Sequence, residues 1–322
     1  QRRRYLFATS EESPLFPVPR AGNAVFINQT THEYNAGMSN TVIAVDLGGT
    51  KADVARVNAG TWTIESKERI PTRAAEGFPT VLEDIAAAIE RQRNDSTVSV
   101  GIGVPGLVTK GMVLTAPNIA RSTNVPVRST LERLTNLPVF VGNDANCFTL
   151  AEARMGAAQG KGIVVGITFG TGVGGGIVID GKVFEGAHGY AAEIGHMLLR
   201  PGQVPYVSDD TRGEVEQYLS GTAMGKRCEA ATSPEQYLEG AVCSFMQPDI
   251  YREVAWLCTN LLYLIDPDLI VFGGSAGHSL AAHVDAIETE LQKWLIPGTP
   301  LPTIVAAKTN DAGILCAALL TA

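Results

Sequence analysis

Apolar residues recur along the chain in two periods, and each period predicts one type of element. Residues 41–47 and 52–58 read as two strands joined across Gly48-Gly49, which predicts a β-hairpin. Residues 78–92 carry apolar side chains at helical spacing. The same reasoning predicts strands over 98–104, 137–142, 162–169 and 269–272, a hairpin over 176–184, and helices over 145–155, 214–228, 250–264 and 312–322.

These elements fall into two similar blocks that begin near residues 41 and 162. Strands that alternate with helices predict α/β lobes on either side of a cleft, with ligands at the strand ends. We expect a small N-terminal lobe over 41–145, joined by the C-terminal helix 312–322, and a large lobe over 146–311. Residues 1–37 show no sustained period and Met38 precedes the first strand closely, so residues 1–40 are expected to be an irregular leader or extension.

Composition narrows the class of protein. The chain has 322 residues, of which 45% are hydrophobic, enough for sizeable cores. A net charge of −8 argues against a nucleic-acid surface. The five cysteines form no Cys-x-x-Cys pair, which favours reduced and mostly buried thiols. No apolar stretch is long enough to span a membrane. A cytoplasmic homodimer without membrane or nucleic-acid partners is expected.

Two glycine-rich segments each follow an apolar run, and this pattern is typical of phosphate-binding turns. The first contains Gly48, Gly49, Thr50 and Lys51, and the second contains Gly170, Thr171 and Gly172. Glycine allows a ligand to approach backbone N–H groups closely, and such groups form anion sites. Asp46 stands where a carboxylate would hold magnesium, through water, beside the phosphates. Two such segments with Asn143-Asp144 between them suggest a nucleotide held between two lobes.

Six ordered motifs resemble those of ROK sugar kinases, a group within the actin/hexokinase-like superfamily. They are Asp46-Leu-Gly-Gly-Thr-Lys51, Gly101-Ile-Gly-Val-Pro-Gly106, Asn143-Asp-Ala-Asn146, Gly170-Thr-Gly-Val-Gly-Gly-Gly176, Glu193-Ile-Gly-His196 and Phe272-Gly-Gly274. The resemblance runs from about Thr41 to the C-terminus. It implies a two-lobed actin-like ATPase fold, related to ribonuclease H, and ATP-dependent phosphorylation of a sugar.

Asp144 is the candidate general base. A sugar hydroxyl is a poor nucleophile, so a base must take its proton as it attacks the γ-phosphorus. The resemblance implies this role for Asp144, and the alternative is that Asp144 caps the following helix. Asn143 and Asn118 match sugar-contacting asparagines of the family, although Asn118 could also be a turn residue after Pro117.

Three further residues match sugar contacts of the family. Glu193 and His196 lie three positions apart, so in a helix or tight turn they share a face and could bind adjacent hydroxyl groups. A lone histidine would more often be a structural residue. Glu216 matches the glutamate of a later family segment. Gly273-Gly274 fits the adenosine end of the nucleotide, where a bulky side chain would block the base.

The chain departs from the family after His196. Most ROK kinases place three cysteines there, which hold a structural zinc together with the histidine. Residues 201–214 contain no cysteine, and Glu214 stands where the last thiolate would be. His196 alone cannot form a soft tetrahedral site, so we predict no zinc. Asp209, Asp210 and Glu214 could bind a hard cation, but an acidic solvated loop is the simpler interpretation.

Together these features predict a kinase that uses ATP and Mg²⁺ to phosphorylate a hexose at the 6-hydroxyl, with glucose as the first choice. N-acetylglucosamine, or another hexose or N-acetylhexosamine, is the alternative substrate. A ROK-type sugar-sensing regulator without kinase activity is less favoured, because the 40 residues before the first strand show no helical period for a DNA-binding unit. A catalytically silent binding protein is disfavoured by the retained Asp46, Asp144 and phosphate turns.

Overall fold

The computed structural model describes residues 40–208, 210–231, 233, 236–238 and 240–322. Residues 38–322 form a compact unit of their own. The expected leader over residues 1–40 lies outside the described residues except for Asn40.

The first five-stranded sheet has the order β3-β2-β1-β4-β7. Its strands are β1 (Thr41–Leu47), β2 (Lys51–Asn58), β3 (Ile64–Pro71), β4 (Thr97–Val104) and β7 (Val139–Asn143). β1, β2 and β3 pair antiparallel, whereas β1, β4 and β7 run parallel. The predicted hairpin across Gly48-Gly49 is confirmed. A small separate hairpin, β5 (Leu107–Thr109) and β6 (Met112–Thr115), follows β4.

The second sheet repeats this topology. Its order is β10-β9-β8-β11-β12, built from β8 (Ile163–Phe169), β9 (Val173–Ile179), β10 (Lys182–Val183), β11 (Leu269–Gly273) and β12 (Ile304–Ala306). Here too an antiparallel hairpin is followed by parallel strands. The two glycine-rich turns therefore occupy equivalent places, at the end of the first strand of each sheet.

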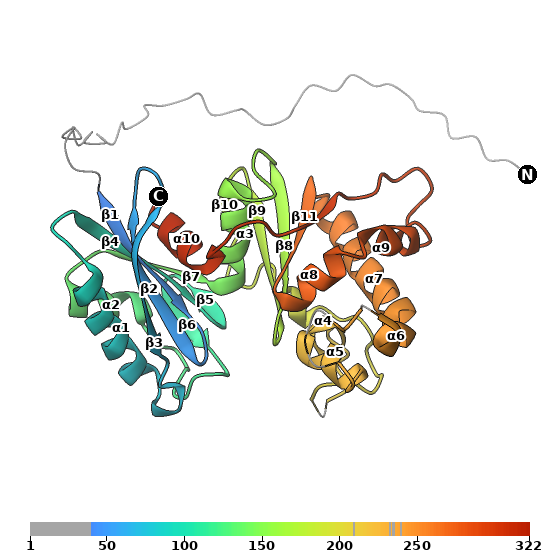
Figure 1. Ribbon diagram of the computed structural model, residues 1–322, viewed down its shortest axis with the longest axis horizontal. Coiled ribbons are helices and arrows are strands. Elements are labelled where there is room, and N and C mark those ends of the chain that lie inside the picture. The colour runs from blue at the N-terminus through green and yellow to red at the C-terminus, as the bar shows by residue number, and fades with distance from the viewer. Residues whose placement is uncertain (1–39, 209, 232, 234–235, 239) are drawn as a thin grey trace, which may run out of the picture. The chain divides into compact units, whose positions relative to one another are not determined.

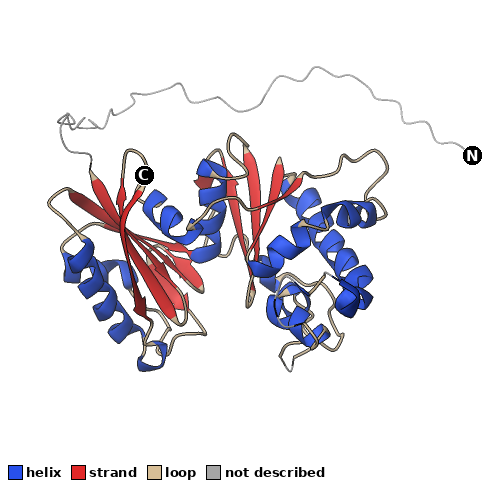
Figure 2. Cartoon of the chain, viewed as in Figure 1, coloured by secondary structure: helices blue, strands red, loops and turns tan. Residues whose placement is uncertain are grey.

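Helices cover both faces of the first sheet (Figures 1 and 2). α1 (Phe78–Gln92) and α2 (Val127–Thr135) pack on one face around a core that includes Phe78, Ile85 and Leu131. α10 (Ala312–Leu319) packs on the other face against β1, β2 and β4. A Cβ on Gly101 would lie 1.7 Å from the carbonyl oxygen of Ala317, so only glycine allows α10 to lie this close to β4. The predicted helix over 78–92 is confirmed, and the C-terminal helix ends at Leu319.

The second sheet lies between α3 (Asp144–Met155) on one side and a larger helical layer on the other (Figure 1). That layer contains α7 (Gln247–Ile265), α8 (Ser275–Ala281) and α9 (Val284–Leu291), together with α4 (Val215–Leu219), α5 (Gly221–Arg227) and α6 (Gly240–Cys243). Periodicity did not reveal β3, β5, β6, α2, α8, α9 or β12, most of which are short or partly exposed. Their positions depend on tertiary packing.

The single helix predicted over 214–228 is wrong, because the chain breaks at Ser220 into α4 and α5. The Ser220 hydroxyl accepts a hydrogen bond from the N–H of Ala223 and so caps α5. The N–H of Gly221 donates to the carbonyl of Gly170 at 2.7 Å. The break therefore places the start of α5 against the second glycine-rich turn.

Glu152 ties together the two chain segments that connect the sheets. Its carboxylate is fully buried and accepts N–H groups from Ala157, which follows α3, and from Lys308 and Thr309, which precede α10. The Thr309 N–H lies 2.7 Å from Oε1. A buried carboxylate is costly unless its oxygens are satisfied, so this geometry requires both connections to lie side by side.

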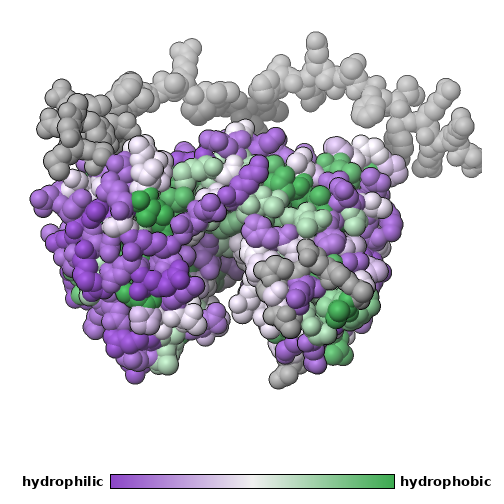
Figure 3. Space-filling model, viewed as in Figure 1, coloured by the Kyte–Doolittle hydropathy of each residue, from purple (hydrophilic) through white to green (hydrophobic). Residues whose placement is uncertain are grey.

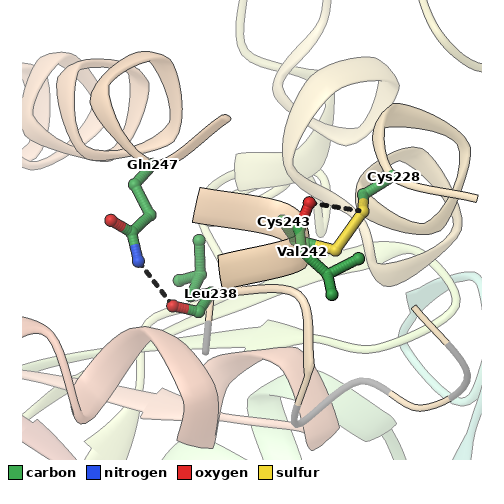
Figure 4. Close-up of a disulfide and its surroundings, with 5 residues drawn as sticks. All are labelled: Cys228, Leu238, Val242, Cys243 and Gln247. Carbon is green, nitrogen blue, oxygen red and sulfur yellow. Dashed lines mark hydrogen bonds between the residues drawn. A yellow bond between two sulfur atoms is a disulfide. The ribbon is translucent and has the colours of Figure 1, made fainter. Parts of the chain in front are cut away.

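The expectation of five reduced cysteines is wrong for one pair. Cys228, just after α5, and Cys243, at the end of α6, form a disulfide (Figure 4). Nearby, the side-chain amide of Gln247 donates to the carbonyl of Leu238 at 2.6 Å. The sequence spacing of these cysteines does not predict the disulfide, because the pairing depends on how the ends of α5 and α6 pack together. Cys147, Cys258 and Cys316 are free and buried, as expected. Within the described residues, no helix combines the length and apolar character needed to cross a membrane.

Candidate active site

The first glycine-rich turn is held by backbone contacts that leave its side chains in solvent. The N–H of Gly48 donates to the carbonyl of Lys51 at 2.9 Å, and the hydroxyl of Thr72 donates to the carbonyl of Gly48 at 2.8 Å. Thr50 and Lys51 are exposed. A Cβ on Gly49 would contact Cβ of Asn118 at 3.4 Å, so the Asn118 turn lies directly beside this one. These contacts within the protein fix the shape of the turn.

The second glycine-rich turn is held in a similar way. Gly170 N–H donates to the carbonyl of Gly172 at 2.9 Å, and the hydroxyl of Thr222 in α5 donates to the carbonyl of Thr171 at 2.7 Å. Thr171 is exposed. A Cβ on Gly172 would lie 2.2 Å from Oε2 of Glu216, so a side chain here would displace the Glu216 carboxylate from the N–H of Val173.

Gly273 and Gly274 follow β11, the parallel neighbour of β8. A Cβ on Gly273 would lie 2.4 Å from the ring of Phe148, and one on Gly274 would lie 2.4 Å from the carbonyl oxygen of Phe169. Packing alone therefore requires glycine at both positions. The expectation that they admit an adenosine stays a prediction.

Asp46, near the end of β1, lies against the start of α10. A Cβ on Gly313 would be 2.2 Å from Oδ2 of Asp46. Burial raises the pKa of Asp46 above its ordinary value, and the charge of Asp53 on the paired strand adds to this effect. Lys51 and Lys67 oppose it. The carboxylate is thus a hard oxygen donor whose charge would be stabilised by a cation.

The helix that carries the candidate base is capped by Asn143. The side-chain oxygen of Asn143 accepts hydrogen bonds from the N–H groups of Ala145 and Asn146 at 2.9 and 3.0 Å. Its amide nitrogen donates to the carbonyl of Gly106 at 2.9 Å and to Oδ1 of Asp144 at 3.1 Å. The alternative that Asp144 serves as the helix cap is therefore wrong, because Asn143 performs that function.

Asp144 is the first residue of α3 and has an unusual charge environment. Solvent reaches the residue, yet protein atoms surround its carboxylate on most sides. This partial desolvation is the main reason why the pKa of Asp144 rises to about 6. The N–H of Ala145 opposes the rise, whereas the negative charges of Asp46 and Glu193 add to it. The structure thus brings three carboxylates from β1, α3 and the segment after β10 into electrostatic range.

Glu193 precedes a single 3₁₀ turn, η2 (Ile194–His196), and His196 is the last residue of that turn. The N–H of His196 donates to the carbonyl of Glu193 at 3.1 Å, so the expected tight turn is present. Burial raises the pKa of Glu193, while His196 lowers it and the charge of Glu216 raises it. Glu216 in α4 accepts the N–H of Val173 with Oε2 at 2.9 Å. Glu193, His196 and Glu216 therefore form one cluster that reaches the second glycine-rich turn.

The acidic segment before α4 is not a freely solvated loop. Glu214 is buried and pairs with Nη1 of Arg212 at 2.7 Å. Asp210 is hydrogen-bonded by Arg212 and Gln217, which lowers its pKa to about 2. Asp209 lies outside the described residues. Among those described, no three His, Cys, Asp or Glu side chains are grouped so that they could hold a metal ion.

Sequence reasoning missed three contributors to this region. They are the backbone N–H of Val173, the buried carboxylate of Glu152 and the side chain of Gln217. A charged residue within the apolar stretch of α3 is a signal that could have indicated Glu152. The other two carry no signal, because a backbone donor and a surface-type amide acquire their roles only from their neighbours.

The space-filling view shows a cleft within residues 38–322, between the part built on the first sheet and the part built on the second (Figure 3). The glycine-rich turns end the first strand of each sheet, so one comes from either part. Two sheets of the same topology, each with a glycine-rich turn after its first strand, define the two-lobed actin-like fold.

Comparisons with known proteins agree with this class. The ROK family matches residues 42–322. The chain is 30% identical over 290 residues to N-acetyl-D-glucosamine kinase of Vibrio atlanticus, covering 83% of this chain and 95% of that protein. It is 32% identical over 308 residues to glucokinase of Streptomyces coelicolor, covering 86% and 96%. Among solved structures, a ROK family glucokinase from Streptomyces griseus in complex with glucose and AMPPNP is 31% identical, covers 87% of this chain and 99% of its own, and superposes with a TM-score of 0.67.

The chain belongs to the ROK family. Within that family it is an enzyme of the ATP-dependent sugar kinase class, to which these relatives belong.

Proposed function

We propose that the protein transfers the γ-phosphoryl group of ATP to the 6-hydroxyl of a hexose, with Asp144 as the general base. The observation that carries this proposal is that Asn143, not Asp144, caps α3, while the Asp144 carboxylate, which accepts the N–H of Ala145 through Oδ1, lies within electrostatic range of Asp46 and Glu193. A pKa of about 6 suits a base that must be ionised at neutral pH yet accept a proton in the transition state. Asn143 would then act partly by orienting the Asp144 carboxylate.

The sugar would be held by side chains around Asp144. Glu193, His196 and Glu216 come from one cluster, and Asn118 stands beside the first glycine-rich turn. Glu216 uses Oε2 for the N–H of Val173, so Oε1 can accept a sugar hydroxyl. Acidic and imidazole groups suit vicinal hydroxyl groups because they accept the hydrogen bonds that hydroxyls donate.

The nucleotide phosphates would lie between the two glycine-rich turns. Residues Gly48, Gly49, Thr50 and Lys51 would face the β- and γ-phosphates, and Gly170, Thr171 and Gly172 would form the second phosphate turn. Gly273 and Gly274 would border the adenosine. Asp46 fits a magnesium ion, reached through water, because its carboxylate is a hard oxygen donor whose desolvated charge a cation would stabilise. The ion would neutralise phosphate charge.

Two lobes, residues 41–145 with 312–322 and residues 146–311, would close on these ligands. The hydrogen bonds of Glu152 to both connecting segments suit this closure of the lobes, because they keep the two segments in register.

We further infer a homodimer as the working form.

Glucose is the substrate that we place first, and N-acetylglucosamine second. Relatives of similar identity carry both names, since a glucokinase is 32% identical and an N-acetylglucosamine kinase is 30% identical. A coupled assay for ADP release with glucose, N-acetylglucosamine, fructose and N-acetylmannosamine tests the proposal. We expect the highest kcat/KM with glucose. Sugar-dependent stabilisation without ADP release would instead indicate a sensor or silent binding protein.

A further inference from the structure

The segment between His196 and Glu216 is folded back on itself, so that its two ends lie together. The N–H groups of Leu199 and Arg200 both donate to the carbonyl of Gly213, at 2.7 and 2.9 Å, and the N–H of Gly202 donates to the carbonyl of Thr211 at 2.9 Å. This pairing brings the two candidate sugar-binding residues at its ends into one cluster. Their positions therefore depend on whatever holds the segment in shape.

Gln217 makes the contacts that hold the second half of the segment. Its side chain is buried, and Oε1 accepts the N–H groups of Gly213 and Glu214 at 2.8 and 2.9 Å. Its Nε2 donates to Oγ of Ser208 at 2.6 Å and to Oδ1 of Asp210 at 2.7 Å. A primary amide offers two donors and one acceptor oxygen, and all of this capacity is used here. One side chain thus collects four polar groups from residues 208–214.

Glu214 fixes the histidine at the other end. Oε2 of Glu214 lies 3.2 Å from Nδ1 of His196, and Oε1 pairs with Arg212. Because a carboxylate only accepts hydrogen bonds, Nδ1 of His196 carries the hydrogen in this contact. Nε2 of a neutral His196 is then the acceptor and is available to a sugar hydroxyl.

These contacts do not fit the zinc site that the family resemblance implies at this place. Residues 197–214 contain no cysteine, and Nδ1 of His196 already contacts Glu214. Cys228 and Cys243 form a disulfide with each other. A structural zinc needs about four soft or imidazole ligands, and the described part of the chain brings no such set together.

We propose that Gln217, together with Glu214, is a positioning residue for sugar binding that holds residues 197–208 and 210–214 by hydrogen bonds in place of a metal. Gln217 keeps the segment folded, and the segment places Glu214 against His196 and sets its tautomer. The inference rests on the proposed function only in naming the sugar as the ligand of His196 and Glu216.

The test compares Gln217→Ala with Gln217→Glu and with a matched control, Gln203→Ala, in the full-length protein. Gln203 is an exposed glutamine of the same segment. Gln217→Glu keeps the acceptor for the two N–H groups but removes both donors and adds charge beside Asp210. We measure KM for sugar and for ATP, kcat, and hydrogen exchange at the amides of Leu199, Arg200 and Gly202.

We expect Gln217→Ala to raise the KM for sugar about tenfold or more, because the loss of several hydrogen bonds weakens binding by at least this factor. The KM for ATP should change less than twofold. Gln217→Glu should fall between Gln217→Ala and wild type, and Gln203→Ala should match wild type. Exchange at the three amides should rise in Gln217→Ala. Pretreatment of the wild type with a chelator, which is removed before Mg²⁺ is restored for the assays, should change none of these values, and elemental analysis should find well under one zinc per chain.

An unchanged KM for sugar together with unchanged exchange in Gln217→Ala would overturn the proposal. So would stoichiometric zinc whose removal loosens the same amides. If the wild type phosphorylates no sugar, the proposed function fails, but hydrogen exchange still decides whether Gln217 holds the segment.

Discussion

The side-chain amide of Asn143 donates to Oδ1 of Asp144 at 3.1 Å, while its carbonyl oxygen caps the helix that Asp144 begins. One residue therefore both completes the helix end and orients the neighbouring carboxylate. This arrangement separates the two interpretations of Asp144, because a residue that is not the cap can be replaced without loss of the helix.

Asp144→Asn should abolish proton acceptance while it preserves shape. We expect kcat to fall by about 10²–10⁴, the usual range for loss of a general base, with the sugar Kd changed only a few-fold. Steady-state kinetics and calorimetric titration measure the two quantities. Turnover close to that of the wild type would refute the mechanism. The control is Asp95→Asn, the same substitution at an exposed position away from the site, and it should leave kcat unchanged.

The pKa of Asp144 predicts a pH dependence for the wild type. Because this pKa is about 6, kcat/KM should fall about tenfold per pH unit below pH 6, as the base becomes protonated. The profile should flatten above about pH 7. A profile that is flat down to pH 4.5 would show that a different group takes the proton.

The raised pKa of Asp144 also makes the stability of the folded protein depend on pH. The direction of this dependence is opposite to that for a salt-bridged carboxylate, whose pKa is lowered. The folded pKa of about 6 lies above the ordinary value of 3.8, so the stabilising contribution belongs to the protonated form and is lost as pH rises through 6. Asp144→Asn should therefore have a higher melting temperature than the wild type at pH 7.5 and nearly the same one at pH 3.5. A lower melting temperature at pH 7.5 would contradict the assigned environment.

Glu193→Gln and Glu216→Gln should weaken sugar binding more than they slow turnover. Each removes a charge-assisted hydrogen bond to the bound sugar, worth up to about 1.5–3 kcal/mol, or roughly 10- to 150-fold in Kd. Glutamine at 216 can still accept the N–H of Val173, so the second glycine-rich turn should persist. The exposed Glu229→Gln is the control. A loss confined to kcat, with the sugar Kd unaltered, would exclude ground-state sugar contacts.

A chain that begins at Met38 should fold and keep most of its activity. Residues 38–322 form a compact unit of their own, and the first strand begins at Thr41. Differential scanning calorimetry and the ADP-release assay should give values close to those of the full chain. Aggregation of the shortened chain, or a clearly lower melting temperature, would mean that residues 1–37 contribute to the folded enzyme.

The sequence by itself determined the elements whose signals are local. The helix over 78–92, the hairpin at Gly48-Gly49 and the second strand–turn–strand at 170–172 follow from apolar periods and glycine turns, which act within a few residues. The order of motifs was enough to identify the family and the candidate residues from Asp46 to Gly274.

Tertiary structure decided what depends on partners distant along the chain. The helix period over 214–228 broke at Ser220 because Gly221 meets Gly170, and Cys228 met Cys243 because the end of α5 lies beside the end of α6. Asn143 rather than Asp144 caps α3, and the Gln217 side chain forms hydrogen bonds with four polar groups of residues 208, 210, 213 and 214. In each case the residue type permitted several partners, and only packing in the folded chain selected one.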